Sequence, residues 1–288
     1  MKRIVLALAL VWLATGTCMA AGEPVWPEEQ PVATEPVGPV DLQLKPAAAT
    51  AGSFSVEIQS RTAIRMLLVP KSTLMGQIDI AGSFSLESAP EGKTIQAFDV
   101  QTASMAYYSP GAPNRDIPRE TITQTLLVSG LPAPGHPVRI VMNGVGKVVD
   151  VAGVPDKYSK YYKTSLLEFA GRPIRVGEAW ANRSTIPVCI DPESEAILCE
   201  ALATFTLTTV DRTADRASIT FTSSYDNAPG QATGTGKIHG TSEGTVIVKL
   251  SDGTPVESRA ISASRLDFGG GNAIDMEQRI RTNMTGAQ

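Results

Sequence analysis

Hydrophobic residues occupy every second position in many short segments of this chain. Phe54, Val56 and Ile58, for example, alternate with polar residues. Successive side chains of a β-strand point to opposite faces, so this alternation is typical of half-buried antiparallel strands. Asn143-Gly144 and Asp252-Gly253 provide turn sequences between such segments. The same alternation occurs in residues 78–81, 84–87, 122–128, 205–208 and 219–222.

Residues 156–170 depart from this alternation and fit an amphipathic helix. Asp156 can cap its start, while Gly171 and Pro173 would stop it. We expect its apolar face to cover a curved sheet, with the tyrosine rings buried and their hydroxyls near water. The same face is the candidate ligand-facing surface. Its side chains recur at i, i+4, i+8 and i+11, namely Tyr158, Tyr162, Leu166 and Phe169.

These elements predict a mainly β fold. We expect a single curved antiparallel sheet or half-barrel with one amphipathic helix packed on it, all within one domain over residues 47–288. The last apolar segment, residues 273–284, fits alternation and helical spacing equally well. Because Gly269-Gly270-Gly271 precedes it and its surroundings are β-rich, we interpret it as a closing strand.

The N-terminal residues 1–21 have the pattern of an export signal. Lys2 and Arg3 precede an apolar core at 4–14, which is too short to span a bilayer. We therefore expect export to the periplasm or the extracellular space.

Two forms of processing fit the end of this signal. A general signal peptidase would cleave after Ala20 or Ala21, whereas a lipoprotein peptidase would leave a lipid on Cys18. The residue before Cys18 is Thr17, which favours soluble export. Membrane attachment is expected only if Cys18 carries lipid.

Residues 22–46 read as a Pro/Glu-rich linker between the signal and the folded domain. Proline lacks an amide donor and fixes φ, so this segment is expected to be extended and unable to pair in a sheet. Its prolines are Pro24, Pro27, Pro31, Pro36, Pro39 and Pro46.

Composition argues against nucleic-acid binding and against a metal site, and it suggests a disulfide. The 25 Lys and Arg are scattered among 29 Asp and Glu, with a net charge of −4, so no basic surface for nucleic acid is predicted. Cys189 and Cys199 are expected to form a disulfide across a short loop in an oxidising compartment. A metal site at these cysteines would need two further ligands, and the chain has only His136 and His239. We predict no metal and no cofactor.

The stretch "HGTSEG", His239 to Gly244, matches the G-x-S-x-G nucleophile elbow and makes Ser242 a candidate nucleophile. Such an elbow needs a helix after the serine, but the β-branched residues 245–250 favour a strand. A catalytic histidine normally lies far from the serine in the sequence, whereas His239 precedes it by three residues. We interpret the stretch as a glycine-rich bend or bulge and assign no catalytic residue.

Two motifs together resemble an uncharacterised family of β-rich bacterial secreted proteins and lipoproteins. The first is Gly146 to Gly153, "GKVVDVAG", and the second is Gly171 to Trp180, "GRPIRVGEAW". Members carry a G-x-V-x-x-V-x-G strand, a helical insert and P-x-x-V-G-x-x-W at the next strand. The resemblance implies an exported β-sheet domain and brings no known catalytic residues.

We therefore expect an exported, non-catalytic β domain that binds an apolar ligand or an envelope protein. A structural or assembly role in the envelope is the alternative, through sheet edges or the proline-rich segment. A serine hydrolase that uses Ser242 is the least favoured hypothesis.

Overall fold

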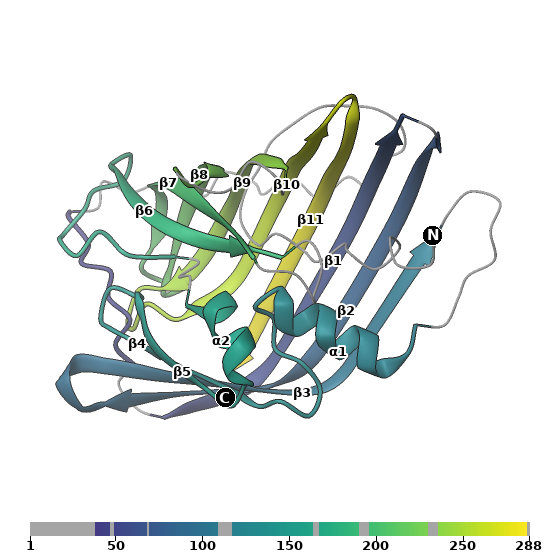
Figure 1. Ribbon diagram of the computed structural model, residues 1–288. Helices are drawn as coiled ribbons and strands as arrows, with labels where there is room; N and C mark the ends of the chain where they lie inside the picture. Colours follow the sequence, from purple (N-terminus) through teal and green to yellow (C-terminus); the bar gives the residue numbers. More distant parts are fainter. Residues whose placement is uncertain are drawn as a thin grey trace.

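The computed structural model describes residues 38–46, 49–67, 69–108, 117–163, 167–189, 196–229 and 236–286. Within these residues the chain forms eleven strands and two α-helices, with a short 3-10 helix at Pro90–Gly92 (Figure 1). The strands are β1 (Thr50–Met66), β2 (Val69–Ala89), β3 (Lys93–Tyr108), β4 (Val138–Met142), β5 (Val148–Ala152), β6 (Ala179–Val188), β7 (Ile197–Asp211), β8 (Arg216–Asn227), β9 (Lys237–Lys249), β10 (Pro255–Gly269) and β11 (Asn272–Gly286). Helix α1 (Arg119–Val128) lies between β3 and β4, and α2 (Asp156–Tyr162) lies between β5 and β6.

All eleven strands form one antiparallel sheet in the order β5-β4-β3-β2-β1-β11-β10-β9-β8-β7-β6. The chain runs from the centre of the sheet to the β5 edge, crosses to the β6 edge through α2, and returns to the centre (Figure 1). The first and last strands therefore pair in the middle of the sheet, from Gly52 opposite Gly286 to Arg65 opposite Ala273. The prediction of a closing strand at residues 273–284 is confirmed by β11.

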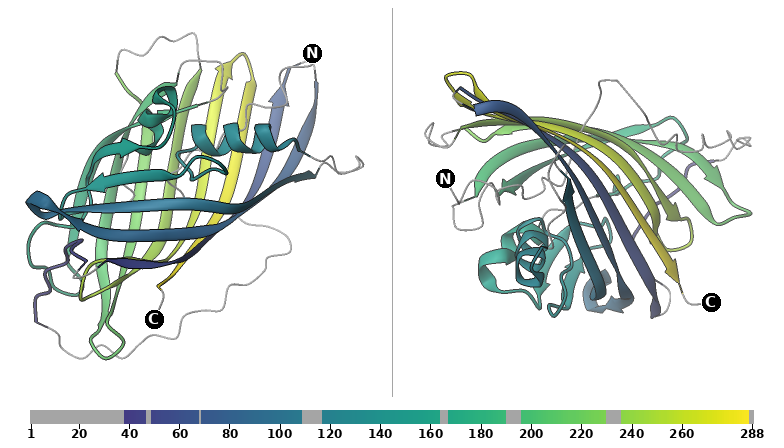
Figure 2. Two further views of the ribbon diagram at one scale, coloured as in Figure 1. Left: turned by 90° about the horizontal axis from the view of Figure 1, so that it is seen from below. Right: turned by 90° about the vertical axis from the view of Figure 1, so that its right-hand side faces the viewer.

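The sheet curves around the two helices, which lie on its concave side (Figure 2). Alternation sorts each strand between the two faces: in β1, Phe54, Val56 and Ile58 are buried in the core that contains both helices, while Glu57 and Gln59 belong to the opposite face. Adjacent strands twist relative to one another, so a wide sheet of this kind curls instead of staying flat. The predicted mainly β fold with a single curved sheet is confirmed.

Helix α1 replaces a strand that the sequence predicted over residues 122–128. The alternation of Ile122, Gln124 and Leu126 also satisfies helical spacing, because Ile122 and Leu126 are four residues apart. The Ile122 amide donates to the Pro118 carbonyl at 3.1 Å, which closes the first helical turn. Leu126 and its neighbour Leu127 are both buried, which a half-buried strand would not allow. The strand prediction was wrong here, and the described part of the chain places two helices on the sheet where one was predicted.

Helix α2 is shorter than the predicted helix at 156–170. It ends at Tyr162, and residues 167–170 are not helical. The Phe169 amide donates to the Val145 carbonyl at 2.8 Å, so it does not bond within a helix. Phe169 still lies in the core, but in a cluster with β7, β8 and β9 and not with α2.

Residues 38–46, predicted as the end of the linker, lie against the fold as an extended segment that we name the strap. Val40 and Ile174 exchange backbone hydrogen bonds of 2.7 and 2.9 Å, and the Leu44 amide donates to the Gly144 carbonyl at 2.8 Å. Val40, Leu42 and Leu44 alternate with exposed residues and are buried with β7–β9. The folded part therefore begins before the predicted boundary at residue 47. The signal at 1–21 and the linker residues up to 37 lie outside the described residues.

Candidate functional site

Ser242 lies in the middle of β9, and no helix follows it. Burial alternates through this strand, so that Ser242 is buried on the concave face while His239 is exposed on the convex face. Strand β9 continues to Lys249, paired with β8 and β10 on its two sides. A serine and a histidine on opposite faces of a sheet cannot exchange a proton directly. The geometry therefore argues against a catalytic dyad of these two residues, and the predicted bend is a regular strand.

The glycines around Ser242 receive aromatic rings from the neighbouring strand. A Cβ at Gly240 would overlap the ring of Tyr225, and a Cβ at Gly244 would come within 2.8 Å of the Phe221 ring. A strand glycine often marks such a close approach, and aromatic side chains that cover it stabilise the sheet. The same arrangement joins three other pairs on the concave face, namely Phe84 with Gly52, Phe54 with Gly82 and Tyr107 with Gly76.

Ser242 also belongs to a polar row that crosses the concave face. Ser223, Ser242, Ser262 and Gln278 lie opposite one another on β8, β9, β10 and β11. The Ser262 hydroxyl donates to Oε1 of Gln278 at 3.3 Å. Among the described residues, Oγ of Ser223, Oγ of Ser242 and Nε2 of Gln278 have no hydrogen-bond partner. The residues opposite Ser242 in this row, Ser223 and Ser262, carry hydroxyls and provide no general base.

Cys189 and Cys199 are buried and carry thiols instead of the predicted disulfide. Cys199 lies opposite Ile186 in the β6–β7 pair, whereas Cys189 follows Val188, three residues further along β6. At about 3.3 Å per residue, this offset separates the two by about 10 Å along the strand. A disulfide needs Cα atoms within roughly 4.4–6.8 Å, so the register excludes the bond. Cys189 instead makes a hydrogen bond with Tyr161; burial raises the pKa of the Tyr161 hydroxyl, and this bond raises it further.

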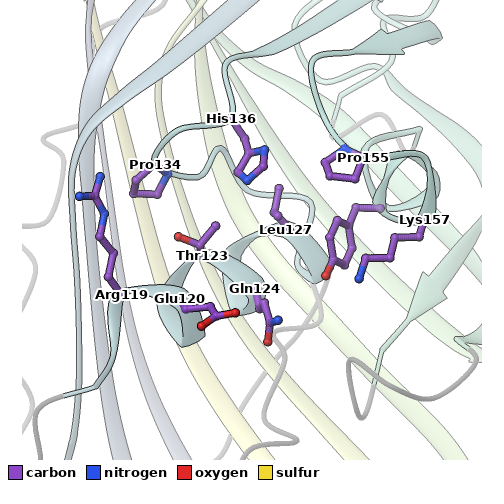
Figure 3. Close-up of a pocket in the computed structure, with 10 residues that line it drawn as sticks. Arg119, Glu120, Thr123, Gln124, Leu127, Pro134, His136, Pro155 and Lys157 are labelled. Atoms are coloured by element: carbon purple, nitrogen blue, oxygen red, sulfur yellow. The ribbon is translucent and has the colours of Figure 1, made fainter.

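A cleft of about 540 Å³ lies between α1, the loop that follows it and the start of α2 (Figure 3). Its volume is within the range of small-molecule sites in proteins. Three segments that are separate in the sequence line it, through Arg119, Glu120, Thr123, Gln124, Leu127, Pro134, His136, Pro155, Lys157 and Tyr158.

The cleft combines an apolar floor with a polar rim. Leu127 and Tyr158 are buried core residues that also line the cleft and form its floor, and the rings of Pro134 and Pro155 add apolar surface. The Lys157 ammonium lies 4.6 Å from the centre of the Tyr158 ring, a cation–π contact. Such a surface can bind the apolar body of a small molecule and orient it through a few polar groups at the rim.

The predicted ligand-facing residues are only partly brought together. Tyr158 lines the cleft. Tyr162 points into the core and donates a hydrogen bond to the Leu131 carbonyl, and burial raises the pKa of its hydroxyl. Phe169 packs in a different cluster, and Leu166 lies outside the described residues. Of the described candidates, Tyr158 alone is a cleft residue, and Tyr162 anchors α2 to the loop after α1.

Sequence reasoning missed the α1 side of the cleft. The alternating pattern predicts a strand that includes Thr123, Gln124 and Leu127, although Pro118 before and Gly130 after them are helix-boundary signals. In the structure Gly130 has a φ of +67°, as expected just beyond a helix.

Two features are absent from the described residues. No three or more His, Cys, Asp or Glu side chains gather there in a way that could hold a metal ion. None of the helices in the described part of the chain is both long enough and apolar enough to cross a membrane.

Comparisons with known proteins do not place the chain in a family. No family model matches it, and no curated protein does either. The resemblance drawn from the two motifs therefore stays a prediction. In the structure these motifs flank α2: the first contains the edge strand β5, and the second ends at the start of the other edge strand, β6.

Some solved structures have similar arrangements of strands at very low identity. Lipovitellin, in a structure of its lipid–protein interactions, is 11% identical with a TM-score of 0.49 over 85% of this chain. This chain spans about a quarter of lipovitellin, 26% of its length. OccK5 (OpdH) of Pseudomonas aeruginosa is 8% identical with a TM-score of 0.30, over 84% of this chain and 99% of its own. OccK7 (OpdD) of the same organism is 10% identical with a TM-score of 0.28, over 84% of this chain and 100% of its own.

Proposed function

We propose that this chain is an exported, non-catalytic domain that binds a small ligand with an apolar body in the cleft between α1 and α2. The observation that carries the proposal is the cleft itself, where Leu127 and Tyr158 present apolar surface between polar side chains. Apolar surface in a concave site of this size gains free energy when a ligand removes it from water.

We infer that the domain is non-catalytic from the geometry of residues 239–244, the segment that matches a nucleophile elbow. Ser242 and His239 lie on opposite faces of β9, so His239 cannot act as the base that the hydrolase hypothesis requires. Export is inferred from residues 1–21, whose charged start and short apolar core fit a signal.

Binding of the neutral fluorescent dye Nile red tests the proposal. We expect saturable binding with a fluorescence increase in the wild type. Thr123→Trp places a large ring in the cleft and should lower the affinity at least about tenfold, because the apolar floor is then filled. Thr121→Trp is the matched control: it makes the same exchange on α1, at a position that does not line the cleft.

Two results would contradict the proposal. One is a wild-type protein that shows no saturable dye binding. The other is dye binding by Thr123→Trp that equals binding by Thr121→Trp, which would place the dye elsewhere on the molecule. Circular dichroism of both variants establishes that each keeps the β fold.

A further inference from the structure

The charges around the cleft are unevenly distributed. Arg119 and Lys157 lie at its opposite ends (Figure 3), and neither forms an ion pair with another described residue. Glu120 is the one carboxylate among the lining residues, and it neighbours Arg119 on α1. A ligand near Arg119 therefore meets charges of both signs, whereas a ligand near Lys157 meets a cation without a lining carboxylate beside it.

Lys157 is held close to the apolar floor. Its ammonium lies 4.6 Å from the centre of the Tyr158 ring, and the body of Tyr158 is buried against the core. This cation–π contact favours a position of the positive charge at the edge of the apolar surface. A negative group there would be near the ammonium while the attached apolar body covers Leu127 and Pro134.

We propose that the ligand is an anionic amphiphile, with a carboxylate or phosphate bound by Lys157 and an alkyl or other apolar body along the floor of the cleft. This inference rests on the proposed function and adds the chemical class of the ligand. The carboxylate of a fatty acid and the phosphate of a lipid headgroup offer the same negative charge, so both are included in the test.

Displacement of Nile red by four compounds that each carry a ten-carbon chain separates the effect of charge from that of the apolar chain. Decanoate and decyl phosphate are anionic, decanol is neutral, and decyltrimethylammonium is cationic. We expect both anions to bind about fivefold or more tightly than decanol, the gain typical of one partly exposed charge pair. The cation should bind more weakly than decanol. The differences in affinity between the anions, decanol and the cation should become smaller as the salt concentration is raised, because salt screens an exposed charge.

Lys157→Gln should remove the preference for the anions over decanol. Lys160→Gln is a closely matched control, because the Lys160 ammonium lies over the Tyr161 ring at 5.3 Å on the same helix but does not line the cleft. It should keep the wild-type preference. A preference for decyl phosphate over decanoate would assign the lipid headgroup as the source of the charge, and the reverse would assign the fatty acid.

The possible failures are distinguishable. If decanoate, decyl phosphate and decanol displace the dye equally, and Lys157→Gln changes none of them, the anionic class is wrong while the proposed binding function stands. If Lys160→Gln loses the preference as fully as Lys157→Gln does, the charge acts from the surface of α2 and the assignment to Lys157 is overturned. If the dye itself does not bind, the proposed function fails and this inference fails with it.

Discussion

At the scale of single residues, the glycines of the "HGTSEG" stretch are explained by packing. Tyr225 is 1% exposed, and its ring covers Gly240 on the neighbouring strand. Its hydroxyl makes a hydrogen bond with Ser264 on the next strand beyond, although burial still raises the pKa of Tyr225. The Tyr225 side chain thus reaches from β8 across β9 to β10. It can do so only because Gly240, the residue on β9 that it crosses, has no side chain.

Gly240→Ala is therefore expected to lower the free energy of unfolding by about 1–3 kcal/mol, as overpacking of a core does. The Tyr225 ring cannot move aside cheaply, because it is buried and hydrogen-bonded. Gly144→Ala is the control, since a Cβ there would meet its nearest neighbour, the Gly92 carbonyl oxygen, only at 3.9 Å. Urea denaturation measures both. Equal stability of the two variants would contradict the packing explanation.

At the scale of elements, the strap shows how an extended segment outside the sheet can stabilise the fold. Leu44 is 4% exposed, and its carbonyl accepts a hydrogen bond from the Thr94 hydroxyl at 3.2 Å. The strap thus connects the β3 side of the sheet with the β7–β9 side, where Leu42 and Leu44 are buried.

Leu44→Ala should lower the free energy of unfolding by about 2–5 kcal/mol, because it leaves a cavity in the core. Gln43→Ala changes the preceding residue, which is exposed, and should change stability by less than about 0.5 kcal/mol. Thermal unfolding followed by circular dichroism distinguishes them. A Leu44→Ala protein as stable as Gln43→Ala would show that the strap is dispensable.

The elements also show which parts of the fold could be predicted from sequence. Strands with one polar face, such as β1 and β8, have a clear period of two, and they were predicted. Helix α1 was missed because Ile122 and Leu126 fit both periods. The strap was missed because its prolines argue against sheet pairing, which is correct, but they do not prevent burial of the leucines between them.

At the scale of the whole molecule, the cleft could not have been predicted from local patterns. Arg119, Pro134 and Tyr158 lie on three segments, and their meeting depends on how α1 and α2 pack under the sheet. The absence of a bond between the two cysteines also could not have been predicted from local patterns. Cys189 and Cys199 are close in sequence, and only the β6–β7 register shows that they are too far apart to bond.

A buried thiol and buried tyrosine hydroxyls make the free energy of unfolding depend on pH in the alkaline range. Burial, and to a lesser extent the charge of Asp226, raises the pKa of the Cys199 thiol from 9.0 to about 12. Below pH 9 the thiol is protonated in both states, so its full contribution to stability is present. Between pH 9 and 12 the unfolded state loses the proton first, so the free energy of unfolding falls as pH rises. Tyr162 and Tyr225 act in the same direction above pH 10.

We therefore expect the urea midpoint to fall from pH 9 upwards, with at most about 1.4 kcal/mol per pH unit from each group. Cys199→Ala should show a smaller decline between pH 9 and pH 10, before the tyrosines contribute. Its stability at pH 8 serves as the reference, since the substitution itself also changes packing. A midpoint that stays constant from pH 8 to pH 11 would exclude this linkage.

The pairing of β1 with β11 at the centre of the sheet has a consequence for how the chain folds. Strands β1 to β5 can assemble as soon as they are synthesised, but one edge of β1 then stays open until β11 arrives. Contacts between residues so distant in sequence form slowly, and an open central edge invites pairing with other chains. A chain built in this way therefore gains from remaining unfolded until its last strand is available.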